Sequence, residues 1–331
     1  MGAWRRRLWP LLAAALLGAE AHAADVRGMT VSTPTWGWEW GTERMDGTLD
    51  TLRDLGVNWV SIHPYAAIGA DGSVQWRDLS PESPPEWLAR PIREAHARGM
   101  KVLVTPHLAY WGSPFSWRGA VAFPDPRVRA RFFREYRAWV VALAQASAGA
   151  DGFVVGSELD GTIGDEAGWR EVIAGVRAVW AGPVTYAANW DAFERVPFWD
   201  ALDVVGIQAY FPLVDGGGVP DDAQLQAGWE RVAARLRAFH QRTGKHIVFT
   251  ELGFDASEGA AARPWEGGAE PTEAGRALQA RCLRVVLRGI DHEPGVIGAF
   301  LWKWFPGEVQ RGDFRMSEPS VRRVIAEVWR P

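Results

Sequence analysis

Short apolar segments alternate with amphipathic helical segments along the whole chain, and this alternation constrains the fold more than any other feature. The helical segments carry apolar residues three and four positions apart, as in Phe132, Tyr136 and Trp139, which is the spacing of one buried helix face. Eight β-branched or apolar runs predict strands, at residues 28–32, 57–62, 101–105, 152–156, 184–188, 204–208, 246–250 and 296–302.

Eight strand and helix units with no linker between them predict one domain. The 331 residues suit an α/β barrel, which needs roughly 200 to 400. We therefore expect a single (β/α)8 TIM barrel in preference to a doubly wound parallel sheet. Asp125-Pro126 and Ser83-Pro84 predict the starts of two helices, and Gly56 and Gly99 predict two helix ends. A last helix at 319–329 would close the ring.

The first residues have the pattern of an export signal. Three arginines at 5–7 precede an apolar run at 8–17, and Ala21-His22-Ala23 supplies small residues for cleavage. We expect a signal peptide at residues 1–23, cleavage after Ala23, and a secreted or periplasmic catalytic domain at 24–331. Either the general or the twin-arginine export route fits the arginines. The apolar run is too short for a membrane span.

Composition excludes several classes of partner. Lys and Arg total 36 against 40 Asp and Glu, so no general attraction to nucleic acid is expected. Cys282 is the only cysteine, which leaves no internal disulfide, and nothing in the sequence implies an obligate protein partner. The chain has 20 Trp beside 5 Tyr, and this excess suggests that some indoles face a ligand.

Polar and aromatic side chains follow seven of the predicted strands. In a barrel these strand ends meet at one face, where the active site lies. Two of these residues are acids that follow strongly apolar runs, a costly position for a charge without a partner. The candidate residues at the strand ends are His63, His107, Glu158, Asn189, Tyr210, Glu251 and Trp302.

Glu158 and Glu251 end strands that lie across the barrel mouth from one another. Such a pair, about 5 to 5.5 Å apart, is what a retaining glycosidase needs. Tyr210, at the end of the neighbouring strand, is placed to donate a hydrogen bond to Glu251 and hold it ionised as the nucleophile. Glu158 would then be the acid/base residue.

The aromatic residues fit a sugar ligand, because a pyranose ring has an apolar face that packs on an indole. We expect Trp302 beneath the reacting sugar, with Trp36 and either Trp111 or Trp117 beside the cleft. Other indoles in helical segments should pack against the barrel wall instead, namely Trp139, Trp169, Trp180 and Trp229.

The segment 252–271 is long for a connection between a strand and a helix. It is interpreted either as a mobile flap that carries Trp265 over the cleft or as a disordered insertion.

The histidines raise the possibility of a metal site. His63, His107 and the two glutamates could surround a divalent ion, but no HxH or HExxH spacing is present. We expect no metal and no cofactor, with both histidines donating hydrogen bonds to sugar hydroxyls or to Glu251. Two alternatives stay open, a metal-dependent barrel enzyme and a non-catalytic carbohydrate-binding barrel of a cell-envelope assembly.

Several segments resemble the strand signatures of the clan A glycoside hydrolases, in particular those of family 113, the β-mannanases and related β-mannosidases. The similar segments are 152–159, 249–253 and 300–304, together with Pro106-His107, Trp117-Arg118-Gly119, Asn189-Trp190-Asp191 and 203–212. The resemblance implies a retaining mechanism, with Glu158 in the acid/base position and Glu251 in the nucleophile position.

The resemblance also implies a β-linked polysaccharide or oligosaccharide substrate, with β-mannan favoured and endo-acting cleavage. One position departs from the clan pattern. Many members have Asn immediately before the acid, where it contacts the sugar 2-hydroxyl, and Ser157 stands there in this chain. Asn189, on the next strand, is the candidate to take over that contact.

Overall fold

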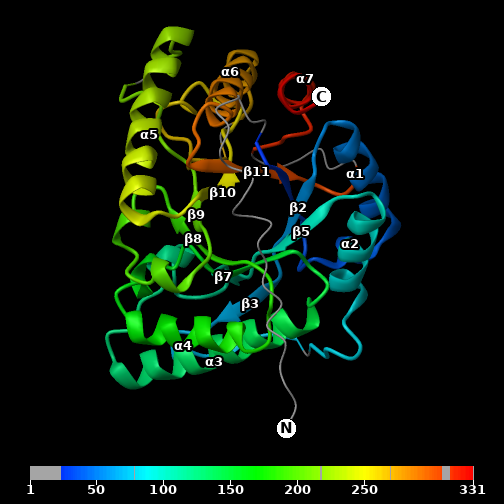
Figure 1. Ribbon diagram of the computed structural model, residues 1–331, viewed down its shortest axis with the longest axis vertical. Coiled ribbons are helices and arrows are strands. Elements are labelled where there is room, and N and C mark those ends of the chain that lie inside the picture. The colour runs from blue at the N-terminus through cyan, green and yellow to red at the C-terminus, as the bar shows by residue number, and fades with distance from the viewer. Residues whose placement is uncertain (1–23, 78, 217, 269, 308–313, 331) are drawn as a thin grey trace.

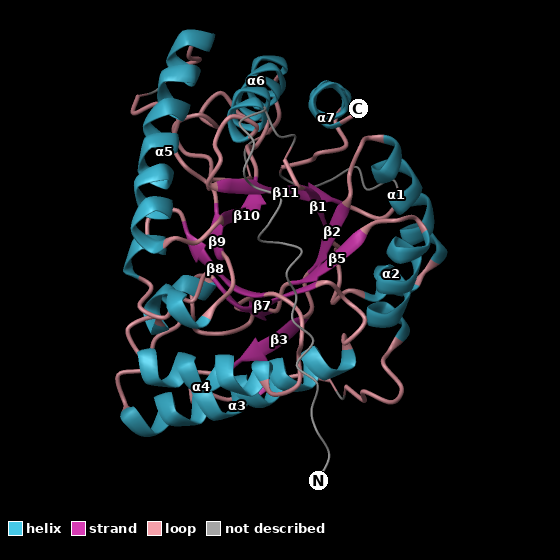
Figure 2. Ribbon diagram, viewed as in Figure 1, coloured by secondary structure: helices cyan, strands magenta, loops and turns pink. Residues whose placement is uncertain are grey.

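The computed structural model describes residues 24–77, 79–216, 218–268, 270–307 and 314–330. Eight parallel strands form a closed barrel, and helices surround it (Figures 1 and 2). The predicted (β/α)8 barrel is confirmed. The expected signal peptide at 1–23 lies outside the described residues.

Each of the eight predicted runs forms one barrel strand. The strands follow one another around the barrel in chain order. They are β1 (Val26–Val31), β2 (Trp59–Ile62), β5 (Lys101–Val104), β7 (Gly152–Ser157), β8 (Val184–Asn189), β9 (Val205–Gln208), β10 (Ile247–Leu252) and β11 (Val296–Trp304).

Three further strands extend the barrel at its mouth. Just beyond β2 and β5 the chain forms β3 (Tyr65–Ile68) and β6 (His107–Ala109), which pair in parallel, while β4 (Val74–Gln75) pairs with β3 in the antiparallel direction. This small sheet therefore continues beyond the carboxyl ends of β2 and β5.

Helices follow seven of the eight barrel strands in the described part of the chain. They are α1 (Glu43–Asp54), α2 (Glu86–Ala97), α3 (Pro126–Ala146), α4 (Glu166–Arg177), α5 (Asp222–Thr243), α6 (Glu273–Ile290) and α7 (Pro319–Trp329). In Figure 1, α3 and α4 lie side by side along the lower edge. The apolar faces of the helices pack against the barrel wall, and Trp139, Trp169, Trp180 and Trp229 are all buried there, as predicted.

The segment between β8 and β9 differs from the expected strand and helix repeat. It forms two 3₁₀ turns, η4 (Phe193–Arg195) and η5 (Trp199–Ala201), and no α-helix. Pro197 lies between the two turns, and a proline there disfavours helical geometry at the preceding residue and lacks an N–H for a helical hydrogen bond.

Helix boundaries agree with most of the predicted signals. The Asp125 side chain accepts a hydrogen bond from the Arg127 N–H at the start of α3. Gly56 and Gly99 follow α1 and α2 with positive φ angles of 90° and 72°, the conformation that glycine tolerates. Helix α2 begins at Glu86, two residues after the predicted Ser83-Pro84, because Pro85 keeps the preceding residue extended.

The barrel interior changes from apolar to polar along its axis. One layer is apolar, and Gly28 leaves the space that the Phe300 ring fills, since a Cβ there would lie 2.4 Å from a ring carbon. Toward the carboxyl ends of the strands the interior holds hydroxyl and amide groups, such as Ser61 and Thr105, whose oxygens are 3.0 Å apart. The apolar layer closes one end of the barrel, and the polar end is available for a site.

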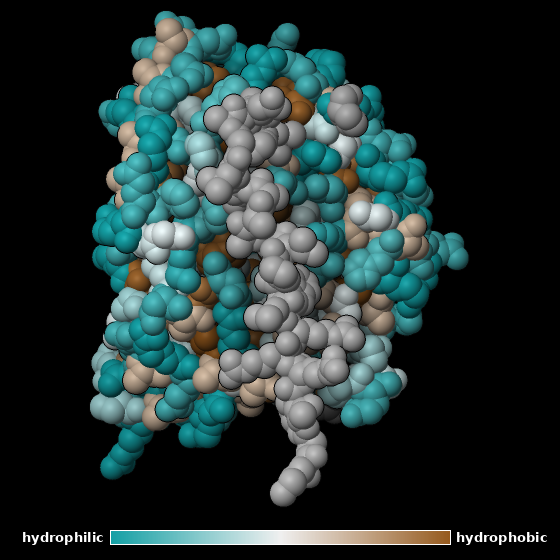
Figure 3. Space-filling model, viewed as in Figure 1, coloured by the Kyte–Doolittle hydropathy of each residue, from teal (hydrophilic) through white to brown (hydrophobic). Residues whose placement is uncertain are grey.

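The view down the barrel shows a surface in which hydrophilic residues prevail and hydrophobic residues appear in small separate patches (Figure 3). No helix among the described residues is long and apolar enough to cross a membrane.

Candidate active site

Two glutamates stand at the carboxyl ends of β7 and β10. Glu251 lies within β10 and its residue is 4% exposed, while Glu158 directly follows β7 with a side chain 15% exposed. Glu158 has a positive φ of 55°, unusual for a residue other than glycine. Its N–H donates to the Ala187 carbonyl at 2.8 Å, which holds the backbone in this strained form.

The Glu251 carboxyl is buried and only partly satisfied. Tyr210 donates a hydrogen bond to Oε2 at 2.7 Å, as the sequence predicted, whereas Oε1 has no partner within the described residues. Burial, and after it the charge of Glu158, raises the pKa of Glu251 to about 8. Arg118, Tyr210 and Gln208 act in the opposite direction.

This balance corrects one expectation. The hydrogen bond from Tyr210 exists, but it does not by itself hold Glu251 ionised, because desolvation and the neighbouring carboxylate outweigh it. Near neutral pH, Glu251 therefore favours its protonated form in the ligand-free protein. The effect of Glu158 on this pKa also places the two carboxyls in one electrostatic environment.

Arg118 joins the site from the loop after β6 and was absent from the predicted site residues. It begins the 3₁₀ turn η2 (Arg118–Ala120), is 9% exposed, and donates from Nη1 to Oε2 of Glu158 at 2.6 Å. Its buried Nε has no partner in the described chain. The Trp117-Arg118-Gly119 segment was the available signal, but nothing in a loop sequence says which way its arginine points.

Gly119 lets the neighbouring Trp117 fold over the loop, since a Cβ there would lie 2.0 Å from the indole. Trp117 itself is 41% exposed, so it lies at the surface beside Arg118.

The two predicted histidines stack on one another beside Glu251. His63 and His107 are fully buried, with ring centroids 4.9 Å apart and planes inclined by 22°. None of their ring nitrogens has a hydrogen-bond partner in the described residues. His107 Nε2 lies 3.6 Å from Oε1 of Glu251, too far for the expected hydrogen bond.

Burial, with Lys303 and Arg118 nearby, lowers the pKa of His63 to about 3, and burial also lowers the pKa of His107. Both rings are neutral at ordinary pH. Their unpaired nitrogens can therefore either donate to or accept from a ligand hydroxyl. No group of three or more His, Cys, Asp or Glu side chains in the described chain could hold a metal ion.

Ser157, which stands directly before Glu158 where many clan members have Asn, is held by a hydrogen bond from another strand. Thr250 donates to the Gln208 amide oxygen at 2.8 Å, and the Gln208 amide nitrogen donates to Ser157 at 3.2 Å. Ser157 is thus part of a buried chain across three strands. Asn189 donates to Asp160 at 3.0 Å, so one of its two amide hydrogens is already engaged.

Asp160 is a second residue that the sequence reasoning missed. It follows Glu158 by two positions, and burial raises its pKa to about 6, while Asn189 partly opposes the shift. Its Oδ1 has no partner among the described atoms.

Aromatic rings surround these groups on several sides. Trp302 packs against His63, with centroids 5.4 Å apart, and against His107 at 6.1 Å. Trp36 and Trp111 form an edge-to-face pair at 5.9 Å, and both are exposed. The structure therefore brings together most of the predicted site residues.

On another side, the Trp265 ring stacks on Trp190 at 5.4 Å, with the planes inclined by 17°. The loop that carries Trp265 is packed, because Ala261 is buried and its carbonyl accepts from the Leu213 N–H. The described residues of the loop thus differ from a disordered insertion.

The sequence and the fold of this chain are similar to those of known proteins. A family model described as Glycoside Hydrolase Family 113 matches residues 29–313. A family 113 β-mannanase from Alicyclobacillus acidocaldarius, solved in complex with ManMIm, is 25% identical with a TM-score of 0.77, over 92% of this chain and 96% of that one.

A structure described as a complex of a family 113 β-1,4-mannanase is 23% identical with a TM-score of 0.79, over 92% of this chain and 98% of that one. A β-glucuronidase from Ruminococcus gnavus is 15% identical with a TM-score of 0.59, over 92% of this chain and 49% of that one. These two likenesses concern the fold alone. No curated protein sequence matches this chain. Because the family model spans most of its length, the protein belongs to glycoside hydrolase family 113 and is a glycoside hydrolase.

Proposed function

We propose that this glycoside hydrolase cleaves a β-linked polysaccharide, with β-mannan favoured, by a retaining double displacement. The observation that carries the proposal is the pair of glutamates at the ends of β7 and β10. The charge of Glu158 raises the pKa of the buried Glu251 carboxyl, so the two acids lie in one electrostatic environment. Two such carboxyls with different surroundings are the requirement for separate acid and nucleophile roles.

Glu251 is the nucleophile in this proposal. Its Oε1 has no partner in the described chain, and its Oε2 is fixed by Tyr210, so one oxygen is available to bond the anomeric carbon while the other is held in place. Glu158 donates a proton to the leaving glycosidic oxygen. In the second step it takes a proton from the water that displaces Glu251.

The ligand-free arrangement must change for this reaction to occur. The raised pKa of Glu251 favours its protonated form, and Arg118 occupies Oε2 of Glu158. We propose that the entering glycosidic oxygen displaces Arg118 from Glu158. Glu158 then accepts the proton that Glu251 releases. Once Arg118 is no longer paired with Glu158, its positive charge stabilises the ionised carboxylate of Glu251, the nucleophile.

The other predicted residues receive binding roles. The stacked neutral histidines offer unpaired nitrogens to sugar hydroxyls, and Trp302 lies against them as a flat apolar surface for the pyranose. The family 113 β-mannanase neighbour at 25% identity supports the choice of mannan. We also propose export of the protein, with residues 1–23 as the signal.

Azide rescue tests the assignment. We expect Glu251→Ala to abolish hydrolysis and azide to restore turnover as a glycosyl azide of inverted configuration. Glu158→Ala should still act on substrates whose leaving groups need no proton, and azide should there give the retained product. A wild-type product of inverted anomeric configuration would contradict the retaining mechanism.

Substrate and class are tested with a panel of β-linked polysaccharides. We expect mannan to be cleaved fastest, with no loss of activity in chelator. Sugar binding without turnover on any polymer would favour the non-catalytic barrel, and loss of activity in chelator would favour a metal-dependent enzyme.

A further inference from the structure

A pocket lies against the small sheet of β3 and β4, next to Tyr65. Its volume is about 380 Å³, within the range of small-molecule sites. Its lining comes from β3, β4, α2 and α3 and from the loop after β1. Its walls are mostly aromatic and include Trp36, Trp38, Tyr65, Trp76, Trp87 and Arg77.

Tyr65 forms a wall common to this pocket and to the glutamate site. Its ring contacts His63 and His107 edge-to-face, at 5.2 Å and 5.8 Å, and Trp36 at 6.0 Å. The charges of Arg118 and Glu251 also act on the pKa of the Tyr65 hydroxyl, which burial raises to about 12. Tyr65 therefore separates the pocket from the histidines beside Glu251, so the pocket and the glutamate site are neighbours.

The pocket has the chemistry of a sugar site. Trp36 and Trp38 are 38% and 42% exposed, and exposed apolar groups that gather at one place mark ligand-binding grooves. The central carbon of the Arg77 guanidinium lies 3.9 Å from the centroid of the Trp38 ring, so the group lies against the indole. A guanidinium held in this way presents several N–H donors to hydroxyl oxygens.

The far end of the pocket is closed. Trp139 and Leu143 of α3 line it, and both belong to the buried core between the helices and the barrel. A ligand that reaches Trp139 and Leu143 must therefore stop there. The space suits one end or one side branch of a chain and does not suit a chain that passes through.

We propose that this pocket binds one glycosyl unit of the polysaccharide substrate, outside the unit that reacts. The sugar ring packs on Trp36 and Trp38, and Arg77 donates hydrogen bonds to its hydroxyls. The proposal rests on the proposed glycoside hydrolase function. Binding energy from this remote unit would favour extended or branched chains over short substrates.

The test compares long and short substrates in variants of the pocket. Trp38→Ala and Arg77→Ala remove exposed groups, whereas Ala67→Leu leaves both in place and fills part of the space from β3. Arg134→Ala is the matched control, because this side chain is 68% exposed on the outer helix α3. Thermal unfolding of every variant checks that the fold is kept.

We expect each pocket variant to lower kcat/KM on the polysaccharide about tenfold and to change kcat/KM on an aryl β-mannoside by less than about twofold. The control should change neither value. An unchanged kcat/KM on the polymer, or an equal fall on both substrates, would overturn the pocket as a remote sugar site.

A binding measurement separates this proposal from the function itself. In a Glu251→Gln background, calorimetry with manno-oligosaccharides of increasing length should show a gain in affinity at one added unit, and Ala67→Leu should abolish that gain. If the wild type cleaves no glycoside, the proposed function fails while calorimetry still decides the pocket. A length series that binds equally well with and without Ala67→Leu would overturn the pocket even in an active enzyme.

Discussion

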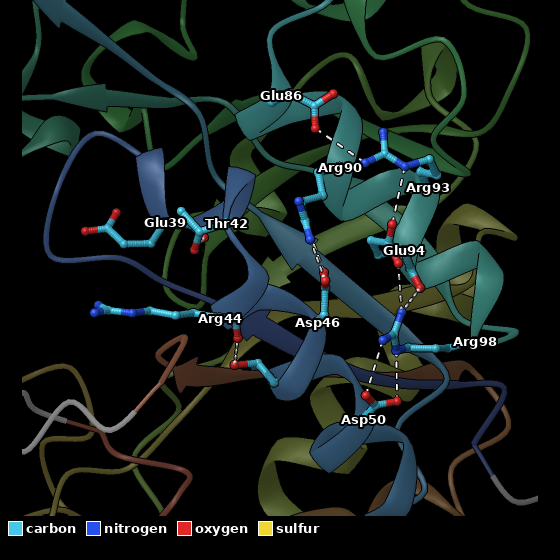
Figure 4. Close-up of polar contacts among 11 residues, drawn as sticks. Glu39, Thr42, Arg44, Asp46, Asp50, Glu86, Arg90, Arg93, Glu94 and Arg98 are labelled. Carbon is cyan, nitrogen blue, oxygen red and sulfur yellow. Dashed lines mark hydrogen bonds and ion pairs between the residues drawn. The ribbon is translucent and has the colours of Figure 1, made fainter.

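The barrel mouth and the outer face of α1 and α2 differ in how far their charged and polar groups are buried and paired. At the mouth, Glu251, Arg118 and the two histidines are buried, and each has at least one polar atom without a described partner. On the outer face, the charged side chains lie near solvent and pair with one another (Figure 4). These pairs are Arg90 with Asp46, Arg98 with Asp50 and Glu94, and Arg93 with Glu86 and Glu94.

The difference shows that the cost in stability lies at the barrel mouth and not on the outer face. Exposed ion pairs contribute little, because water screens them and already solvates each partner. Buried polar atoms without partners cost stability until a ligand supplies the missing contacts. We therefore expect substitutions at the mouth to trade activity for stability, and substitutions on the outer face to change little of either.

The largest effect is expected at the buried nucleophile. Glu251→Gln should lower kcat by roughly 10⁴-fold or more, since no other group in the site replaces it. The same change should stabilise the fold near neutral pH, because the amide carries no charge to desolvate.

The direction of this change in stability follows from the raised pKa of Glu251. Burial lifts the pKa of Glu251 from 4.5 to about 8, so its contribution to stability is complete below pH 4.5 and is lost as the pH rises toward 8. The Tm advantage of Glu251→Gln should therefore grow across this interval, to roughly 5 °C at its upper end. Calorimetric scans from pH 4 to pH 9 measure it, and a variant less stable than wild type at pH 8 would contradict the cost assigned to this carboxyl.

An intermediate effect is expected at the arginine that contacts the acid. Arg118→Met should lower kcat/KM by about 10²-fold, because a buried charge that stabilises the ionised site is lost. Arg118 lowers the pKa of Glu251, so its removal should move the low-pH limb of the kcat/KM profile to higher pH. A matched pH series on one aryl glycoside checks both effects. If the rate falls but the limb stays in place, Arg118 supports only local structure.

The smallest effect is expected on the outer face. Arg90 binds Asp46 through two hydrogen bonds, at 2.6 Å and 3.1 Å, and this lowers the pKa of Asp46. A lowered pKa contributes stability above the unfolded value of 3.8 and loses it as the pH falls below that value. Asp46→Asn should therefore cost less than about 1 kcal/mol at pH 7, and the cost should vanish near pH 2.

Urea unfolding at both pH values measures the stability of Asp46→Asn, and an aryl glycoside assay should give wild-type activity. A cost of several kcal/mol at pH 7 would mean that the two regions do not differ as described.

Much of the site could be predicted because parallel barrel strands all end at one face. The acids after 152–157 and 247–250, and the histidines after two other strands, converge for that reason alone. Arg118 and Asp160 could not be found in this way, because they lie on loops and 3₁₀ turns whose direction no periodicity encodes. The pocket beneath Trp38 was missed for the same reason, since its walls come from separate segments.

The alternation of apolar runs and helical faces by itself determined the barrel, and the order of its strands determined which residues reach the mouth. Local signals such as Asp125 and Gly56 also determined several helix boundaries. Only the tertiary structure decided the balance of charge among Glu158, Glu251 and Arg118. A hydrogen bond, a burial cost and a neighbouring charge act on one carboxyl at once, and their sum depends on distances across the barrel that a linear sequence does not contain.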